Sequence, residues 1–156
     1  MPAQILLIDD SPLITTGIQE ELKRLSDNYL VIDIAANFYE AEELLKQNEY
    51  NVICLDLNMP SIRGQKCFNE LNGTTLNGWL FLKHYIFKED APYKNICKNS
   101  QFFVFSGYIE ELKNHIRMSG VAQVDEKTWF SLLTLVPKGT GVYEELVQSI
   151  LKSLRL

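Results

Sequence analysis

The sequence is poor in cysteine and in positive charge. It has three Cys, and its 15 Lys and Arg residues face 20 Asp and Glu residues, for a net charge of -5. Proteins that bind nucleic acid normally carry a basic face, so we predict that the chain does not bind nucleic acid directly. Cys54, Cys67 and Cys97 are an odd number, and their spacings match no zinc signature. We therefore predict reduced thiols.

Long apolar runs are also missing. No run approaches the length of a membrane span, and the first residues lead into a strand pattern without the basic and hydrophobic regions of a signal peptide. These absences predict a cytoplasmic protein that does not enter a membrane. A length of 156 residues, 46% of them hydrophobic and 22% charged, is ordinary for a soluble chain. We expect one domain, residues 1–156, with no room for a separate output domain.

Short apolar runs alternate with helical patterns along the chain. Apolar residues recur every three to four positions in the helical patterns, whereas the runs lack polar alternation, as in strands covered on both faces. This alternation predicts an α/β fold with a parallel sheet and right-handed crossovers. The strands are expected at 4–8, 30–35, 52–55, 102–105 and 132–136, and the main helices at 12–26, 38–48, 109–118 and 143–154.

Four of the five expected strands end in small or charged polar residues. These ends hold Asp9-Asp10, Asp56, Ser106 and Lys138. Parallel strands place their carboxyl ends at one edge of a sheet, where ligands bind in such folds. Two readings stay open from the residues alone. A lone Asp at a strand end is commonly turn chemistry, and Asp9, Asp10 and Ser11 could simply cap the next helix. Two adjacent carboxylates, however, repel each other unless a cation lies between them.

The order of these residues resembles a known family. Along the chain come Asp9-Asp10, then Asp56-Leu57-Asn58-Met59-Pro60, then Ser106-Gly107, and finally Lys138. This order resembles the CheY-like receiver domain of bacterial two-component response regulators. The resemblance implies a doubly wound, five-stranded parallel sheet of order 2-1-3-4-5 with helices on both faces, which is a flavodoxin-like fold. It covers the chain except for two apparent insertions, at about 61–76 and 123–130.

The third helix has two candidate starts within this resemblance. Gly64 lies eight residues after Asp56, as the family's glycine does, but Asn77-Gly78 is followed by a longer apolar periodicity. We favour Gly78 as the start of that helix.

The resemblance also implies roles for the residues at the strand ends. Asp56 would be the nucleophile that becomes an aspartyl phosphate. Lys138 would supply positive charge to the phosphoryl group, and Ser106 would supply a hydroxyl. Mg²⁺ would be held by Asp10, Asp56 and the backbone carbonyl of Asn58, with Asp9 acting through water. The protein would then be no enzyme beyond its own phosphorylation and dephosphorylation.

Several features depart from the family pattern. The family has Lys followed by Pro, but here the order is Pro137-Lys138, and Leu135 replaces an aromatic residue that reports the signalling state. Tyr108 is a candidate substitute. His84 and His115 lie on expected helices, and we predict that they are surface or half-buried residues with no partner.

The function implied is that of a stand-alone response regulator. It would receive phosphate from a histidine kinase or a phosphotransfer protein and signal to a downstream protein partner. The apolar stripe of the last helix, at 143–154, is wide enough to suggest a second copy of the chain as a further partner. The alternative is a phosphate-independent interaction module with the same fold. A phosphatase is disfavoured because Asn58 occupies the place of a second acid.

Overall fold

The computed structural model describes residues 2–26, 29–59, 76–118, 124–139 and 143–154. Its five strands form one parallel sheet in the order β2-β1-β3-β4-β5. The predicted doubly wound fold and its strand order are therefore confirmed. The strands are β1 (Ala3–Ile8), β2 (Leu30–Ala35), β3 (Val52–Leu55), β4 (Gln101–Ser106) and β5 (Leu133–Pro137).

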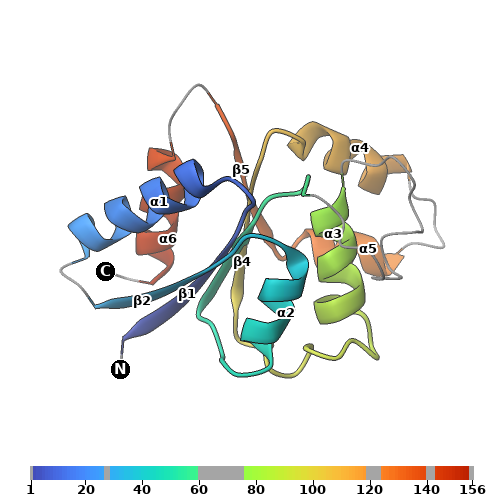
Figure 1. The fold of residues 1–156 in the computed structure, drawn as a ribbon. Helices are drawn as coiled ribbons and strands as arrows, with labels where there is room; N and C mark the ends of the chain where they lie inside the picture. Colours follow the sequence, from blue (N-terminus) through green and yellow to red (C-terminus); the bar gives the residue numbers. More distant parts are fainter. Residues whose placement is uncertain (1, 27–28, 60–75, 119–123, 140–142, 155–156) are drawn as a thin grey trace.

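The helices cover both faces of this sheet, as Figure 1 shows. On one face lie α1 (Pro12–Leu25) and α6 (Glu144–Ser153). On the other face lie α2 (Phe38–Leu45), α3 (Asn77–Phe81), α4 (Ile109–Met118) and α5 (Val124–Phe130). The chain after α3 continues as a π-helix, η2 (Leu82–Phe87).

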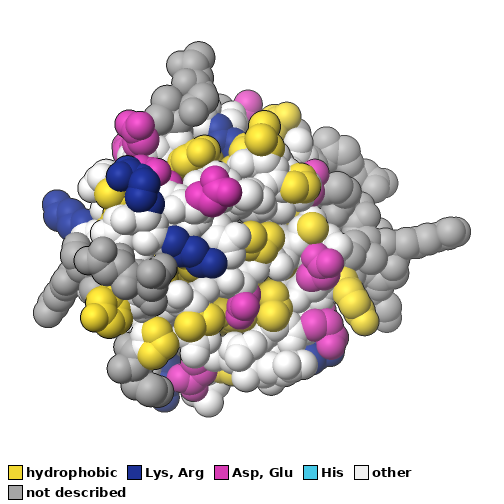
Figure 2. Space-filling model, turned by 60° about the vertical axis from the view of Figure 1, so that its left-hand side comes forward, with side chains coloured by type: hydrophobic (Ala, Val, Ile, Leu, Met, Phe, Trp, Pro, Cys, Tyr) yellow, Lys and Arg dark blue, Asp and Glu magenta, His cyan; other side chains and the backbone are white. Residues whose placement is uncertain are grey.

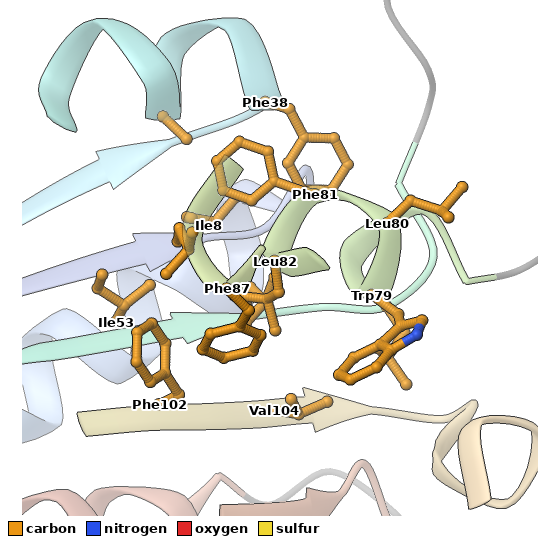
Figure 3. Close-up of a cluster of buried hydrophobic side chains, with 14 of the residues drawn as sticks. Ile8, Phe38, Ile53, Trp79, Leu80, Phe81, Leu82, Phe87, Phe102 and Val104 are labelled. Atoms are coloured by element: carbon orange, nitrogen blue, oxygen red, sulfur yellow. The ribbon is translucent and has the colours of Figure 1, made fainter. Parts of the chain in front are cut away.

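Two hydrophobic clusters fill the layers between sheet and helices. Residues 5–8 of β1 and all four residues of β3 are apolar, as expected of strands covered on both faces, and alternate residues of these strands belong to different clusters. Figure 3 shows the larger cluster, in which the rings of Phe38 and Phe81 stack with their centroids 4.8 Å apart. The smaller cluster lies under α1 and α6.

The apolar stripe of α6 packs inside the protein. Leu146, Val147, Ile150 and Leu151 are buried in the smaller cluster, and Leu154 packs against its edge. These side chains pack against the sheet and α1 of their own chain. A second copy of the chain as a partner stays a prediction.

The third helix begins where the sequence favoured. α3 starts at Asn77 with Gly78 in its first turn. Gly64, the alternative start, lies outside the described residues, as does nearly all of the insertion expected at 61–76. α2 ends at Leu45, earlier than the predicted residue 48. The side chain of Ser11 makes no capping hydrogen bond to α1.

The second expected insertion, at 123–130, includes helix α5, which the sequence analysis did not anticipate. Its Trp129 is half-buried and stacks with Phe87, with ring centroids 6.3 Å apart. α5 thereby packs on η2 and closes this end of the larger cluster. Whether the segment is an insertion relative to the family stays a prediction.

Candidate functional site

Three carboxylates meet at the carboxyl edge of the sheet. Asp9 and Asp10 follow β1, and Asp56 follows β3, which pairs with β1. Oxygen atoms of the three side chains lie within 4.8 Å of one another. Asp9 and Asp56 are buried, whereas Asp10 is exposed. The predicted gathering of these residues from separate parts of the chain is therefore what the fold produces.

Lys138 lies between two of the carboxylates. Its Nζ donates to Asp9 Oδ2 and to Asp56 Oδ2, at 2.9 Å in each case. Its Nζ also lies 5.5 Å from the centroid of the Phe105 ring. The ammonium thus offsets the repulsion between the two buried acids.

The reversed Pro137-Lys138 order does not turn this lysine away. Pro137 pairs with Ser106, and the N–H of Lys138 then donates to the carbonyl oxygen of Ser106 at 3.0 Å, so the ladder between β4 and β5 continues. β5 is an edge strand, where a missing proline N–H is tolerated. The side chain of Lys138 is therefore delivered to the edge that holds the acids.

Turn chemistry orients the same carboxylates. The N–H of Ser11 donates to Asp9 Oδ1 at 3.0 Å, and the N–H of Asn58 donates to Asp56 Oδ1 at 3.3 Å. In each acid one oxygen satisfies the local turn and the other faces Lys138. The turn-forming interpretation therefore holds for these carboxylates, and their role as site residues stays a prediction.

The charges at the site perturb one another. Burial raises the pKa of Asp9, although its hydrogen bonds with Lys138 and Ser11 oppose that rise. Burial alone would lower the pKa of Lys138, but its hydrogen bonds with Asp9 and Asp56 outweigh burial and raise that pKa. Lys138 therefore stays charged at neutral pH. Burial also raises the pKa of the neighbouring Cys54 thiol, and the carboxylate of Asp9 adds to that rise.

Ser106 ends β4 with a side chain that is 0% exposed. Its Oγ accepts a hydrogen bond from the N–H of Tyr108 at 3.1 Å. Tyr108 and Leu135 are both half-buried against the larger cluster. The structure thus holds Ser106 at the same edge as the acids.

Gly78 presses against the backbone of Asp56. Its N–H donates to the carbonyl oxygen of Leu57 at 2.9 Å. A Cβ at this position would lie 2.3 Å from the carbonyl oxygen of Asp56 and 2.9 Å from Cα of Leu57. The sequence predicts Gly78 at a helix start, but it predicts neither this contact nor the position of Phe105 beneath Lys138. Both contacts join separate elements, so local patterns carry no signal for them.

The donor set suits a hard divalent cation. Carboxylate oxygens are the ligands that Mg²⁺ prefers, and exposed Asp10 leaves one side of the group open to water. Asn58 is exposed two residues after Asp56. The role of its backbone carbonyl as a ligand stays a prediction.

Comparisons with known proteins find similarity to response regulators. Residues 5–79 match the sequence model of the response regulator receiver domain. The nitrate/nitrite response regulator protein NarL of Escherichia coli is 36% identical over 77 residues, which are 49% of this chain and 35% of that protein. The homologous protein of Haemophilus influenzae is 39% identical over 61 residues, or 39% of this chain and 29% of that protein. The chain thus spans about a third of these curated relatives.

Solved structures share the whole fold. A response regulator receiver domain protein from Methanospirillum hungatei aligns with a TM-score of 0.61 and 13% identity, covering 99% of this chain and 95% of that one. The response regulator TrrA of Thermotoga maritima, solved in complex with Mg²⁺ and BeF, aligns with a TM-score of 0.55 and 22% identity, covering 97% and 98%. Ser106 and Lys138 lie beyond the segment that the family match covers, so their placement rests on this fold.

Proposed function

We infer from the match of residues 5–79 that the chain is a receiver domain of the response regulator family, whose members signal through phosphorylation, and we propose that Asp56 is its phosphoacceptor. The observation that carries the proposal is the pair of 2.9 Å hydrogen bonds that join Lys138 to Asp9 and to Asp56. A turn at the end of a strand does not require a lysine between two buried acids, so this arrangement favours a binding site at the sheet edge.

Each residue has a proposed role in the reaction. A carboxylate oxygen of Asp56 attacks the phosphorus of the donor, the bond from phosphorus to the donor's leaving group breaks, and an acyl phosphate forms. An ammonium has three N–H donors, and two of those of Lys138 already bind carboxylates. We propose that the third binds a phosphoryl oxygen, and that the hydroxyl of Ser106 binds another.

Asp9, Asp10, Asp56 and the carbonyl of Asn58 are the proposed ligands of Mg²⁺, with Asp9 acting through water. When bound, Mg²⁺ would supply positive charge that neutralises the oxygens of the phosphoryl group. The Mg²⁺ and BeF bound to the Thermotoga maritima relative support this assignment by similarity.

The proposed partners are proteins. A histidine kinase or a phosphotransfer protein would supply the phosphoryl group, and a downstream protein would read the change. Figure 2 shows the side of the molecule that carries α1 and α6, where acidic and basic side chains of the described residues are interspersed without a continuous basic stripe. Together with the net charge of -5, this surface supports output through protein contact rather than through nucleic acid. In the described part of the chain, no helix has the length and apolar character to cross a membrane.

Phosphorylation by acetyl phosphate tests the proposal. Wild-type protein incubated with acetyl phosphate and Mg²⁺ should gain the mass of one phosphoryl group, and the Asp56→Asn variant should gain none. Intact mass spectrometry measures both, and chelation of Mg²⁺ should suppress the gain. An unchanged wild-type mass would favour a phosphate-independent interaction module instead.

A further inference from the structure

A buried carboxylate joins helices on the side of the sheet away from α1 and α6. Glu126, on α5, is 3% exposed. Its Oε1 accepts a hydrogen bond from Nε1 of Trp79, 3.2 Å away at the start of α3. The same oxygen lies 3.3 Å from Nζ of Lys83 on η2 and 3.5 Å from Nε2 of His115 on α4. His115, predicted to lack a partner, therefore has one.

Among these contacts, the one with Trp79 lies nearest in the chain to the proposed phosphoacceptor site, because Trp79 follows Gly78. Trp79 is 0% exposed and follows Gly78, the residue whose N–H bonds to Leu57 and whose Cα faces the backbone of Asp56. The Trp79 ring contacts Phe87, and Figure 3 shows its nitrogen directed away from that ring. The indole N–H is thus the polar end of a side chain otherwise surrounded by apolar groups.

A hydrogen bond fixes the Trp79 ring in addition to its packing. The ring meets Phe87 at a tilted angle of 54° with centroids 6.4 Å apart. The indole has a single donor, so its polar edge is directed by the bond to Glu126. This bond therefore adds a directional restraint to the first turn of α3, which also holds the Gly78 contact against Asp56.

We propose that Glu126 is a positioning residue for phosphorylation of Asp56, acting through the hydrogen bond that it accepts from Trp79. The inference rests on the function proposed above. It assigns to α5 a part in the reaction, although α5 contributes no group to the site itself. Geometry at a reacting centre is sensitive to small displacements, so loosening α3 should slow the transfer.

Two substitutions at Glu126 separate the Trp79 bond from the ion pairs. Glu126→Gln keeps an oxygen that accepts from Trp79 and loses the charge that faces Lys83 and His115. Glu126→Met keeps the size and loses both. With acetyl phosphate and Mg²⁺, we expect Glu126→Met to slow phosphorylation about tenfold and Glu126→Gln to react at a rate close to that of wild type. Rates are measured at a temperature at which circular dichroism shows every variant folded.

A double-mutant cycle tests the route through Trp79. Trp79→Phe should slow phosphorylation as Glu126→Met does, and the double variant should be no slower than either, because both remove the same bond. Glu21→Met is the matched control, since Glu21 also accepts a hydrogen bond from a neighbouring cation, Arg24, but on the solvent side of α1. It should leave the rate unchanged.

The outcomes separate this inference from the proposed function. If wild-type protein takes up no phosphate, the proposed function fails and this inference fails with it. If wild type reacts but folded Glu126→Met reacts equally fast, only the inference is overturned. It is overturned as well if Glu126→Gln is as slow as Glu126→Met, or if the effects of the Glu126 and Trp79 substitutions multiply.

Discussion

Among single residues, Lys138 has the largest electrostatic role, because its ammonium compensates the charges of two buried carboxylates. Its ammonium contacts Asp9 and Asp56 at 2.9 Å each, and its side chain is only 21% exposed. Removing one partner of a buried ionic group is costly because the remaining charge loses its compensation. A divalent cation at the same place would supply that compensation in another form. The lysine and the cation therefore have overlapping electrostatic tasks.

The Lys138→Met variant should test this overlap. Without Mg²⁺ we expect the free energy of unfolding to fall by roughly 3 kcal/mol, because Asp9 and Asp56 are left to repel each other. Saturating Mg²⁺ should recover part of the loss, and the affinity for Mg²⁺ should rise. Urea denaturation with and without Mg²⁺ measures both effects. Equal stability of variant and wild type in the absence of Mg²⁺ would contradict the account.

Glu126 gives a pH dependence with a defined sign. Burial alone would raise the pKa of its carboxyl, but the hydrogen bond from Trp79 and the charge of Lys83 lower that pKa below its ordinary value of 4.5. A group whose pKa is lower in the folded state binds fewer protons there, so it stabilises the fold above pH 4.5. That stability is lost as the pH falls through the folded-state pKa.

Comparison of wild type with Glu126→Gln checks this sign. The variant cannot titrate at this position, so the stability advantage of wild type at pH 7 should shrink as the pH is lowered below 4.5. Urea denaturation of both proteins across the acidic range gives the difference. An advantage that grows toward acid pH would show that the charge of Glu126 is not the stabilising form.

At the scale of elements, the junction between β3 and α3 holds the site. α3 begins against the end of β3, and only a residue without a side chain fits where Gly78 meets Asp56 and Leu57. The constraint on Gly78 is steric, because a Cβ there would overlap the backbone of Asp56 and Leu57, which follow β3.

Gly78→Ala should therefore destabilise the protein by about 2 kcal/mol through overpacking and should slow phosphorylation by displacing Asp56. Gly107→Ala is a matched control for the glycine-to-alanine change, since a Cβ there has no heavy atom within 4 Å. Urea denaturation and intact mass spectrometry of both variants provide the comparison. Equal effects of the two substitutions would mean that the close approach at Gly78 is unimportant.

Elements with a long apolar pattern were predictable, whereas those that depend on tertiary contact were not. β2 at 30–35 and α4 at 109–118 match their predicted ranges because their apolar residues recur at the proper period. α5 is only seven residues long and mixes charged with aromatic residues, so its sequence has no apolar periodicity that would predict a helix. Its buried Glu126 is paired with residues from three other elements, and no local pattern shows such a pairing.

At the scale of the whole molecule, parallel strand order explains the site. β1, β3, β4 and β5 are neighbours, and their carboxyl ends bring together residues that are up to 129 positions apart in the chain. The sequence alone predicted that these residues meet, because four of the five expected strands end in polar residues and the fold class places those ends at one edge of the sheet. The distances and the double contact of Lys138 required coordinates.

Peptide mapping of the phosphorylated protein tests the central claim most directly. After acetyl phosphate and Mg²⁺ treatment, tandem mass spectrometry should find the phosphoryl group on Asp56 and on no other residue, and the modification should be lost in alkali as expected of an acyl phosphate. A phosphoryl group on Asp9, on Asp10 or on a serine, or its absence from Asp56, would contradict the account.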